Sequence, residues 1–275
     1  MFALLCFLNL TVVLAQGKVD KSKKALTESE GVNYQKSHAA PAQNSSGDSG
    51  GNSLLGDIIV GVFTYTVGAV GKYALIGDYK YEDHLHNDLT YYPYHKPEAG
   101  NFYTPEADEA SVYKFRVDLE DKFLYSNNDL FANHLEVKVR PLAALYLKTD
   151  YYRIFELNEI AGTRDQLSLW YFNFAYDRIR FERFNLGWTL GASYVAGEVD
   201  RGGFSFGLNA DYFLKKNISF TAGAKWSHIN GEPVHDYEFE SKFHRRQYYF
   251  GVGFEQLKIA KPVYNFVTVG GGLYF

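Results

Sequence analysis

Residues 184–194 read Phe-Asn-Leu-Gly-Trp-Thr-Leu-Gly-Ala-Ser-Tyr, so large apolar side chains alternate with small or polar ones. Successive side chains of a β-strand point to opposite faces, and a period of two therefore predicts a strand with one apolar and one polar face. The same alternation appears in residues 113–119, 135–139, 170–176, 204–212 and 218–226. We expect strands from Val112 to the end of the chain.

These strands favour an all-β fold, a transmembrane antiparallel β-barrel of about 10 strands (range 8–12) with an N-terminal amphipathic helix. Tyr (23) and Phe (22) are abundant, as in barrels with aromatic rings at both membrane interfaces. The expected strands are also long enough for a tilted membrane crossing, which needs about 9 to 11 residues. An even strand number puts the first and the last residue of the barrel on the same side of the membrane, the periplasmic side.

The connections between the expected strands alternate between short and long. Short breaks are expected near Arg140-Pro141 and at 178–180, 215–217 and 244–246, and longer ones at 126–132, 157–165, 197–202, 229–233 and 258–262. Outer-membrane barrels have short periplasmic turns and longer external loops. The pattern therefore predicts that the longer set faces the cell exterior.

Residues 1–15 form a short apolar run ending in Val13-Leu14-Ala15, which predicts a secretory signal peptide cleaved before Gln16; a buried N-terminal strand is the alternative. Cys6 is the only cysteine, so the mature chain would have no disulfide. The formal net charge of −4 gives no reason to expect a nucleic-acid partner, because nucleic-acid binding needs a clustered excess of Lys and Arg.

The segment before the barrel divides into two parts. Residues 16–53 are polar and small, which predicts a disordered tether. Residues 54–110 hold an N-terminal helix and a Tyr- and His-rich stretch, and the barrel takes 111–275. Apolar residues in 54–74 recur at helical spacing, although a strand pair remains an alternative because of the glycines and β-branched residues. A spanning helix is disfavoured by Asp57 and Lys72.

Histidines in the Tyr-rich stretch form a weak candidate metal site. In a strand, His84 and His86 would project from one face, and His95 with nearby aspartates would complete a divalent-metal shell. The alternative is a loop packed against the barrel mouth.

Charged side chains on the polar strand faces predict a lumenal charge network. Lys114, Arg116, Lys138 and Arg140 form a basic stripe, and Asp236, Glu238 and Glu240 form an acidic one. Opposite charges attract strongly in a narrow lumen of low dielectric. We expect a salt-bridged plug that fills the barrel; a conducting pore and a binding lumen are the alternatives.

A hydrolase pattern is visible but incomplete. Ser227-His228-Ile229-Asn230 contains residue types of a catalytic triad, but Ser227 and His228 would point to opposite faces of a strand. We expect no catalytic residues and no cofactor.

Several segments resemble uncharacterised outer-membrane barrels of the Bacteroidota type: residues 83–87 with 91–94, 184–188, 216–220 and 270–275. The C-terminal strand ending in Phe275 is also similar to the sorting signal of bacterial outer-membrane barrels. The resemblance covers 54–275 and implies a location in the outer membrane of a Gram-negative bacterium. The implied partners are outer-membrane lipid, the barrel-assembly machinery and an envelope protein. We expect a non-enzymatic structural or interaction role, with a narrow pore or a lipid-modifying barrel enzyme as alternatives.

Overall fold

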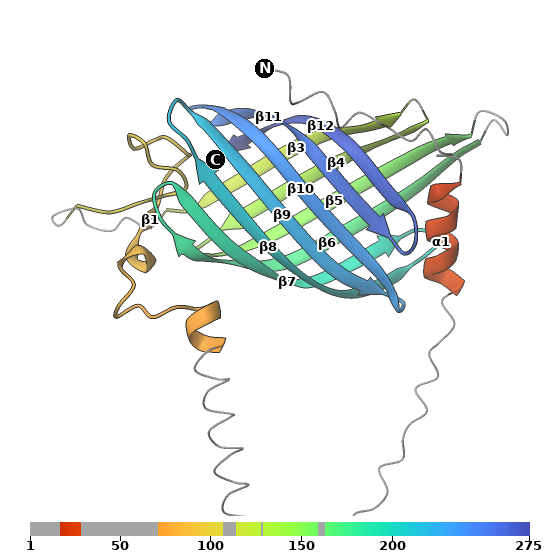
Figure 1. The fold of residues 1–275 in the computed structure, drawn as a ribbon, viewed down its shortest axis with the longest axis horizontal. Helices are drawn as coiled ribbons and strands as arrows, with labels where there is room; N and C mark the ends of the chain where they lie inside the picture. The colour runs from red at the N-terminus through yellow and green to blue at the C-terminus, as the bar shows by residue number, and fades with distance from the viewer. Residues whose placement is uncertain (1–16, 29–70, 107–113, 128, 159–162) are drawn as a thin grey trace, which may run out of the picture.

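The computed structural model describes residues 17–28, 71–106, 114–127, 129–158 and 163–275. Ten antiparallel strands form a closed barrel (Figure 1). They are β3 (Arg116–Asn127), β4 (Leu130–Arg140), β5 (Leu145–Asn158), β6 (Thr163–Arg180), β7 (Phe184–Ala196), β8 (Arg201–Phe213), β9 (Ile218–Ile229), β10 (Glu232–Arg245), β11 (Tyr248–Ile259) and β12 (Val263–Tyr274). The predicted strand number is confirmed.

The last strand closes the barrel against the first. β12 pairs with β3 in a register that sets Leu273 opposite Leu119, and Phe275 exchanges two backbone hydrogen bonds with Val117, at 2.9 and 3.0 Å. The first strand begins at Arg116, slightly later than expected. Closure matters because an open sheet edge would leave backbone groups without partners in hydrocarbon.

Connections are short at both ends of the barrel, so the expected alternation of short and long loops is wrong. The terminal end, where β3 begins and β12 ends, has connections 141–144, 181–183, 214–217 and 246–247. The opposite, distal end has 128–129, 159–162, 197–200, 230–231 and 260–262. Asn230 and Gly231, at φ 52° and 83°, explain one of the errors, because an Asn-Gly pair with two positive φ angles makes a two-residue hairpin turn.

The expected tether contains a docked helix, so that prediction is wrong for residues 18–28. Helix α1 (Lys18–Glu28) packs against the distal end, and its buried side chains are Val19, Ser22 and Leu26. They recur at a spacing of three and four, which is one face of a helix. The sequence did not predict this helix because the segment contains few apolar residues. The remainder of the tether, 29–53, lies outside the described residues.

An apolar cluster fills the distal half of the lumen beneath α1. Inward side chains from nearly every strand contribute to it: Leu124, Leu130, Ala132, Tyr152, Ile154, Leu167, Leu169, Tyr171, Val195, Ile229, Val234, Leu257, Ile259, Tyr264 and Phe266. Val19 and Leu26 of α1 and Val199 of the β7–β8 connection complete it. The distal end is therefore closed by a hydrophobic core.

The terminal end is covered by residues 77–103, which we call the cap. It contains a short 3-10 helix, η1 (Asp83–His86), and a two-stranded sheet of β1 (Asp88–Leu89) and β2 (Phe102–Tyr103). Within the described ranges, no helix is long and apolar enough to span a membrane. Of the helix expected over 54–74, residues 54–70 lie outside the described part, and 71–75 are helical.

Candidate functional site in the barrel lumen

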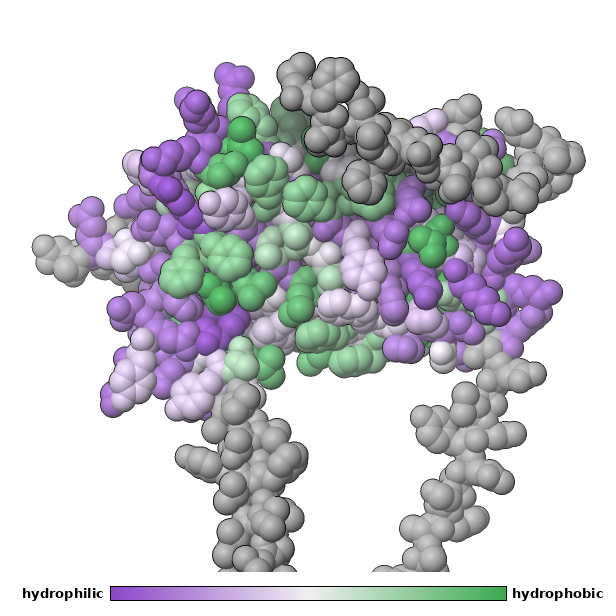
Figure 2. Space-filling model, in the orientation of Figure 1, coloured by the Kyte–Doolittle hydropathy of each residue, from purple (hydrophilic) through white to green (hydrophobic). Residues whose placement is uncertain are grey.

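The two faces of the barrel wall differ sharply in polarity. The outer face carries large exposed apolar side chains, including Phe174, Phe204, Phe250, Val252 and Val267, each at least 60% exposed. Figure 2 shows an apolar zone across the middle of the barrel with hydrophilic surface toward both ends. The inward face carries buried charges instead. A water-soluble barrel would have the reverse arrangement, whereas a transmembrane barrel needs this one. The protein is an outer-membrane β-barrel.

Arg116 and Arg140 hold the part of this outer-membrane barrel's network nearest the terminal end. The Arg116 guanidinium donates to both carboxylate oxygens of Asp118, at 2.7 and 2.9 Å. Arg140 contacts Asp118 at 3.3 Å and Asp177 at 2.8 Å. Lys138 pairs with Glu136 at 2.7 Å. Charge-assisted, bidentate contacts of this kind fix side-chain geometry strongly.

The acidic stripe also finds its cations elsewhere, so the two predicted stripes do not pair with each other. Asp236 pairs with Lys225 at 2.8 Å, Glu238 with Lys122 at 3.1 Å and Glu240 with Lys242 at 3.2 Å. The network is therefore interleaved, with each stripe compensated by residues of opposite charge on its own strand, on adjoining strands and on strands across the lumen.

A continuous chain of interactions crosses the centre of the lumen. Lys122 Nζ lies 2.6 Å from Glu255, whose carboxylate lies 2.9 Å from His134 Nδ1. His134 Nε2 lies 3.1 Å from Asp150, which Lys225 contacts at 3.1 Å. Both ring nitrogens of His134 thus face carboxylates, and they donate to both only as an imidazolium. A buried chain of this kind is stable only while every charge keeps its partner.

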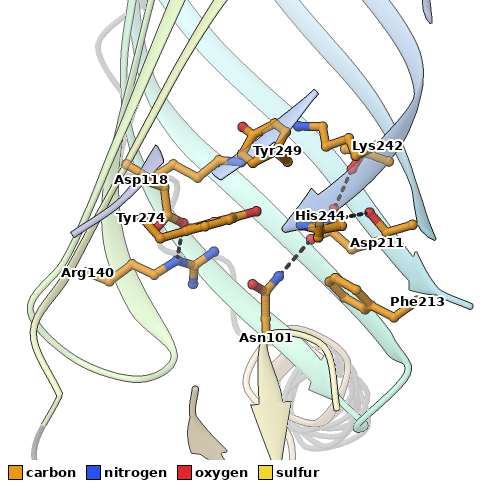
Figure 3. Close-up of a pocket in the computed structure, with 12 residues that line it drawn as sticks. Asn101, Asp118, Arg140, Asp211, Phe213, Lys242, His244, Tyr249 and Tyr274 are labelled. Atoms are coloured by element: carbon orange, nitrogen blue, oxygen red, sulfur yellow. Dashed lines mark hydrogen bonds and ion pairs between the residues drawn. The ribbon is translucent and has the colours of Figure 1, made fainter. Parts of the chain in front are cut away.

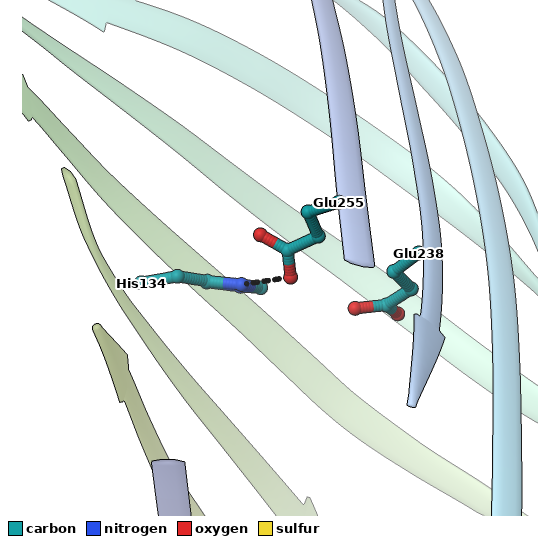
Figure 4. A group of neighbouring side chains, drawn as sticks. All are labelled: His134, Glu238 and Glu255. Atoms are coloured by element: carbon teal, nitrogen blue, oxygen red, sulfur yellow. Dashed lines mark hydrogen bonds and ion pairs between the residues drawn. The ribbon is translucent and has the colours of Figure 1, made fainter. Parts of the chain in front are cut away.

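His134, Glu238 and Glu255 approach closely enough to resemble a metal site (Figure 4). Each offers one ligand atom, and the three atoms lie within 4.8 Å of one another. The Lys122 ammonium, however, already contacts both carboxylates, at 3.1 and 2.6 Å. A metal ion would have to displace that lysine. The cluster is better described as two carboxylates that share the Lys122 ammonium.

The candidate metal-binding histidines lie in the cap and do not converge. His84 and His86 belong to η1 and not to a strand, so the expectation of one shared face is wrong. His84 Nε2 lies 3.2 Å from Glu82, His86 Nε2 lies 2.8 Å from the Tyr79 carbonyl, and the His95 ring packs on Tyr92. In the part of the chain that the structure describes, none of the three belongs to a group with metal-ligand geometry.

The cap is fastened to the barrel by charge. Arg178 contacts both carboxylate oxygens of Glu82, at 2.9 and 2.7 Å, and this hydrogen bonding lowers the pKa of Glu82 to about 2. Burial lowers the pKa of His84 below its ordinary value, against the opposing charge of Glu82. Both shifts favour a docked cap at neutral pH.

Lys114 is the one predicted network residue that lies outside the lumen. It precedes β3, and its ammonium donates to Tyr103 Oη at 2.8 Å while lying 4.4 Å from the centre of that ring. It therefore helps to hold the cap. Arg116 connects the cap to the network, because it also donates to Asn101 Oδ1 at 2.9 Å.

Small side chains make room for the long charged ones. On Gly223, a Cβ atom would collide with the Glu238 carboxylate, and on Gly251 with that of Glu240. In the middle and at the terminal end of the lumen, the inward faces of β6 to β8 carry mostly short residues. Five polar ones have buried side-chain atoms without a hydrogen-bond partner among the described atoms: Asn173, Asn185, Thr189, Ser205 and Asn209. Long charged chains from the other strands thus extend toward a wall of short residues.

A small cavity lies between the network and the cap (Figure 3). Asn101 of the cap reaches Asp211 there at 3.3 Å. Ser219 Oγ and His244 Nε2 are 2.7 Å apart, which resembles the nucleophile and base of a hydrolase. Nδ1 of His244 has no hydrogen-bond partner among the described atoms, so the acid that orients such a base is missing.

The hydrolase pattern seen in the sequence does not form a site. Ser227 is buried in the lumen and donates to the Val234 carbonyl, whereas His228 is exposed on the opposite face of β9. The expectation that the two side chains point apart is confirmed.

Sequence reasoning missed several members of the network, chiefly Lys122, His134, Lys148, Asp150 and Glu255. The signal was present, because Lys122 continues the alternation of Arg116 and Asp118, and Lys148 with Asp150 continues the same period on β5. What the sequence lacked was the set of partners across the lumen, such as Lys122 with Glu255.

No family model and no curated protein matches the chain. Solved structures of similar architecture include Ail from Yersinia pestis (9% identity, TM-score 0.35, covering 59% of this chain and 100% of that one). An outer membrane channel from Pseudomonas putida F1 has 10% identity and a TM-score of 0.34, covering 63% and 100%. LpxR from Salmonella typhimurium has 8% identity and a TM-score of 0.36, covering 61% and 86%. Similarity this low transfers no function.

Proposed function

We propose that this protein is a non-conducting, non-enzymatic barrel with a structural or interaction role in the cell envelope. The filled lumen is the observation that carries the proposal. Charged side chains occupy its middle and terminal parts, the apolar cluster occupies its distal part, and α1 and the cap cover the two mouths. A solute would have to break buried ion pairs and a hydrophobic core in turn, which is costly.

Planar-bilayer recording of the full-length protein tests the proposal. We expect no discrete conductance steps from this protein. A variant in which Lys122, Glu238 and Glu255 are all replaced by Ala should conduct, because it removes three long side chains that pair with one another, while His134 keeps Asp150 as a carboxylate partner. Steps from the unmodified protein at moderate voltage would contradict the proposal. A variant that conducts shows that the assay detects an opened lumen.

A narrow pore is the second candidate, favoured by the short polar wall of β6 to β8. Buried polar atoms without protein partners, such as those of Asn173, Asn185 and Asn209, are where ordered water is expected. A file of water along this wall would carry small solutes around the charged plug. Swelling of liposomes that contain the protein, in small neutral sugars, distinguishes this pore from a sealed barrel.

A lipid-modifying enzyme is disfavoured by the placement of the Ser219–His244 pair. Both side chains are buried in the lumen, whereas membrane lipid contacts the outer face. Fatty-acid release from envelope lipid by the purified protein, abolished by Ser219→Ala, would support the enzyme and contradict the non-enzymatic role.

A further inference from the structure

Helix α1 lies across the mouth of the barrel that is farthest from both barrel termini. At one edge of the mouth, the backbone amides of Lys18 and Val19 donate to Glu156, near the end of β5. At another edge, Asn230 in the β9–β10 turn donates to the Leu26 carbonyl at 2.7 Å. Both anchoring residues lie at the distal end, opposite Arg116 and Tyr274, where the barrel begins and ends.

The chain next enters the described structure at the terminal end, on the outside of the wall. Residues 71–75 are helical, and three barrel side chains from β6 and β7 donate to carbonyls at the end of this helix. Arg178 donates to Tyr73 at 2.9 Å, Trp188 Nε1 to Leu75 at 2.9 Å and the Tyr176 hydroxyl to Ile76 at 2.8 Å. The last carbonyls of a helix need such donors, and a cation suits the negative end of its dipole.

Residues on this outer wall are suited to lipid. Tyr73, Leu75 and Ile76 are each about half exposed, and their barrel partners Tyr176 and Trp188 are aromatic residues of the kind that mark a membrane interface. Residues 73–76 thus lie against the lipid-facing surface of β6 and β7 at the terminal end. By contrast, the exposed residues of α1 are mostly charged, including Asp20, Lys21 and Lys24, as expected at an aqueous surface.

The lumen gives no route between these two places, because buried ion pairs and the apolar cluster fill it. An even strand number puts both barrel termini on one side, which in outer-membrane barrels is the periplasmic side. We propose that α1 is displayed at the cell surface while the cap lies in the periplasm, so that the N-terminal part of the chain is divided between the two sides of the outer membrane.

Cysteine accessibility in intact cells tests the proposal. Cys6 is the only cysteine of the chain, so Cys6→Ser gives a cysteine-free background. Lys21→Cys reports on α1 and Lys80→Cys on the cap, and both positions are exposed. Arg201→Cys at the distal end and Lys216→Cys at the terminal end are matched barrel controls. A membrane-impermeant maleimide is applied before and after permeabilisation, to variants that retain the folded, heat-modifiable form.

We expect Lys21→Cys and Arg201→Cys to be labelled fully in intact cells. Lys80→Cys and Lys216→Cys should be labelled only after the outer membrane is permeabilised. If Lys21→Cys and Lys80→Cys fell into the same class, the division of the N-terminal chain between two compartments would be wrong. If the two pairs exchanged classes, the assignment of α1 to the cell surface would be wrong. Neither result depends on whether the lumen conducts.

Discussion

The backbone amide of Val19 donates a 2.7 Å hydrogen bond to the carboxylate of Glu156, which lies 137 residues further along the chain. The same carboxylate accepts from the Lys18 amide at 3.0 Å. The first amides of a helix lack partners within the helix and are usually satisfied by a local Ser, Thr, Asp or Asn. Gln16 and Gly17, which precede α1, are not residues of this kind. The Glu156 carboxylate of β5 therefore accepts the hydrogen bonds that an N-cap side chain would otherwise accept.

Glu156→Ala is therefore expected to loosen α1 by about 0.5 to 2 kcal/mol, the usual range for loss of an N-cap. Hydrogen exchange of the amides in α1 measures this loosening, with the barrel strands unchanged. Glu28→Gln, an exposed change at the other end of the helix, serves as the control. Equal protection in both variants would show that Glu156 does not hold the helix.

Lys122→Met tests the centre of the charge network. The substitution keeps a similar volume but leaves Glu238 and Glu255 without the amine that both contact. An uncompensated buried charge costs about 3 to 5 kcal/mol, so the midpoint of urea unfolding in detergent micelles should fall clearly. Lys216→Met, in an exposed connection, should leave the midpoint unchanged. Equal unfolding midpoints for Lys122→Met and Lys216→Met would mean that the charge network contributes little to the stability of the barrel.

Leu208→Arg tests which face meets lipid. Leu208 lies in the middle of β8 and is 43% exposed on the outer wall. Arginine near the midplane of a bilayer costs a membrane barrel about 2 to 4 kcal/mol. Folding into phospholipid vesicles should therefore be destabilised, whereas Leu142→Arg in an exposed connection should have little effect. Equal stability of both variants would argue against lipid at this surface.

The cap should be released by acid in two stages. Burial lowers the pKa of His84, so the stability that neutral His84 contributes begins to decline as the pH falls below about 6.5, its ordinary pKa. The Arg178 contact lowers the pKa of Glu82 to about 2, so its contribution is complete above about pH 4.5 and is lost as the pH falls toward 2.

Protection of the cap amides around Leu85 from hydrogen exchange should therefore decline in both pH ranges. Glu82→Gln should remove the lower stage while preserving the fold of the barrel. Retention of that stage in Glu82→Gln would assign it to another carboxylate.

Much of the barrel was predictable because membrane strands show their two environments directly in the sequence. The alternation through Phe204, Leu208 and Tyr212 on one face and Ser205, Asn209 and Asp211 on the other marks β8 without any knowledge of its neighbours. Loop lengths were not predictable in the same way. Turn residues such as Asn230 and Gly231 form a tight hairpin as readily as part of a long loop.

The sequence by itself determined that this chain builds a closed membrane barrel and that its charges, Arg116, Arg140 and Glu238 among them, face inward, because side-chain alternation is a local property of an extended backbone. Only the tertiary structure decided which charges pair, where His134 lies, and that Val19 and Leu26 make a polar segment dock over one mouth. Those relationships join residues far apart in the chain, such as Lys122 with Glu255 and Val19 with Glu156, and they arise only when closure of the barrel brings distant strands around one lumen.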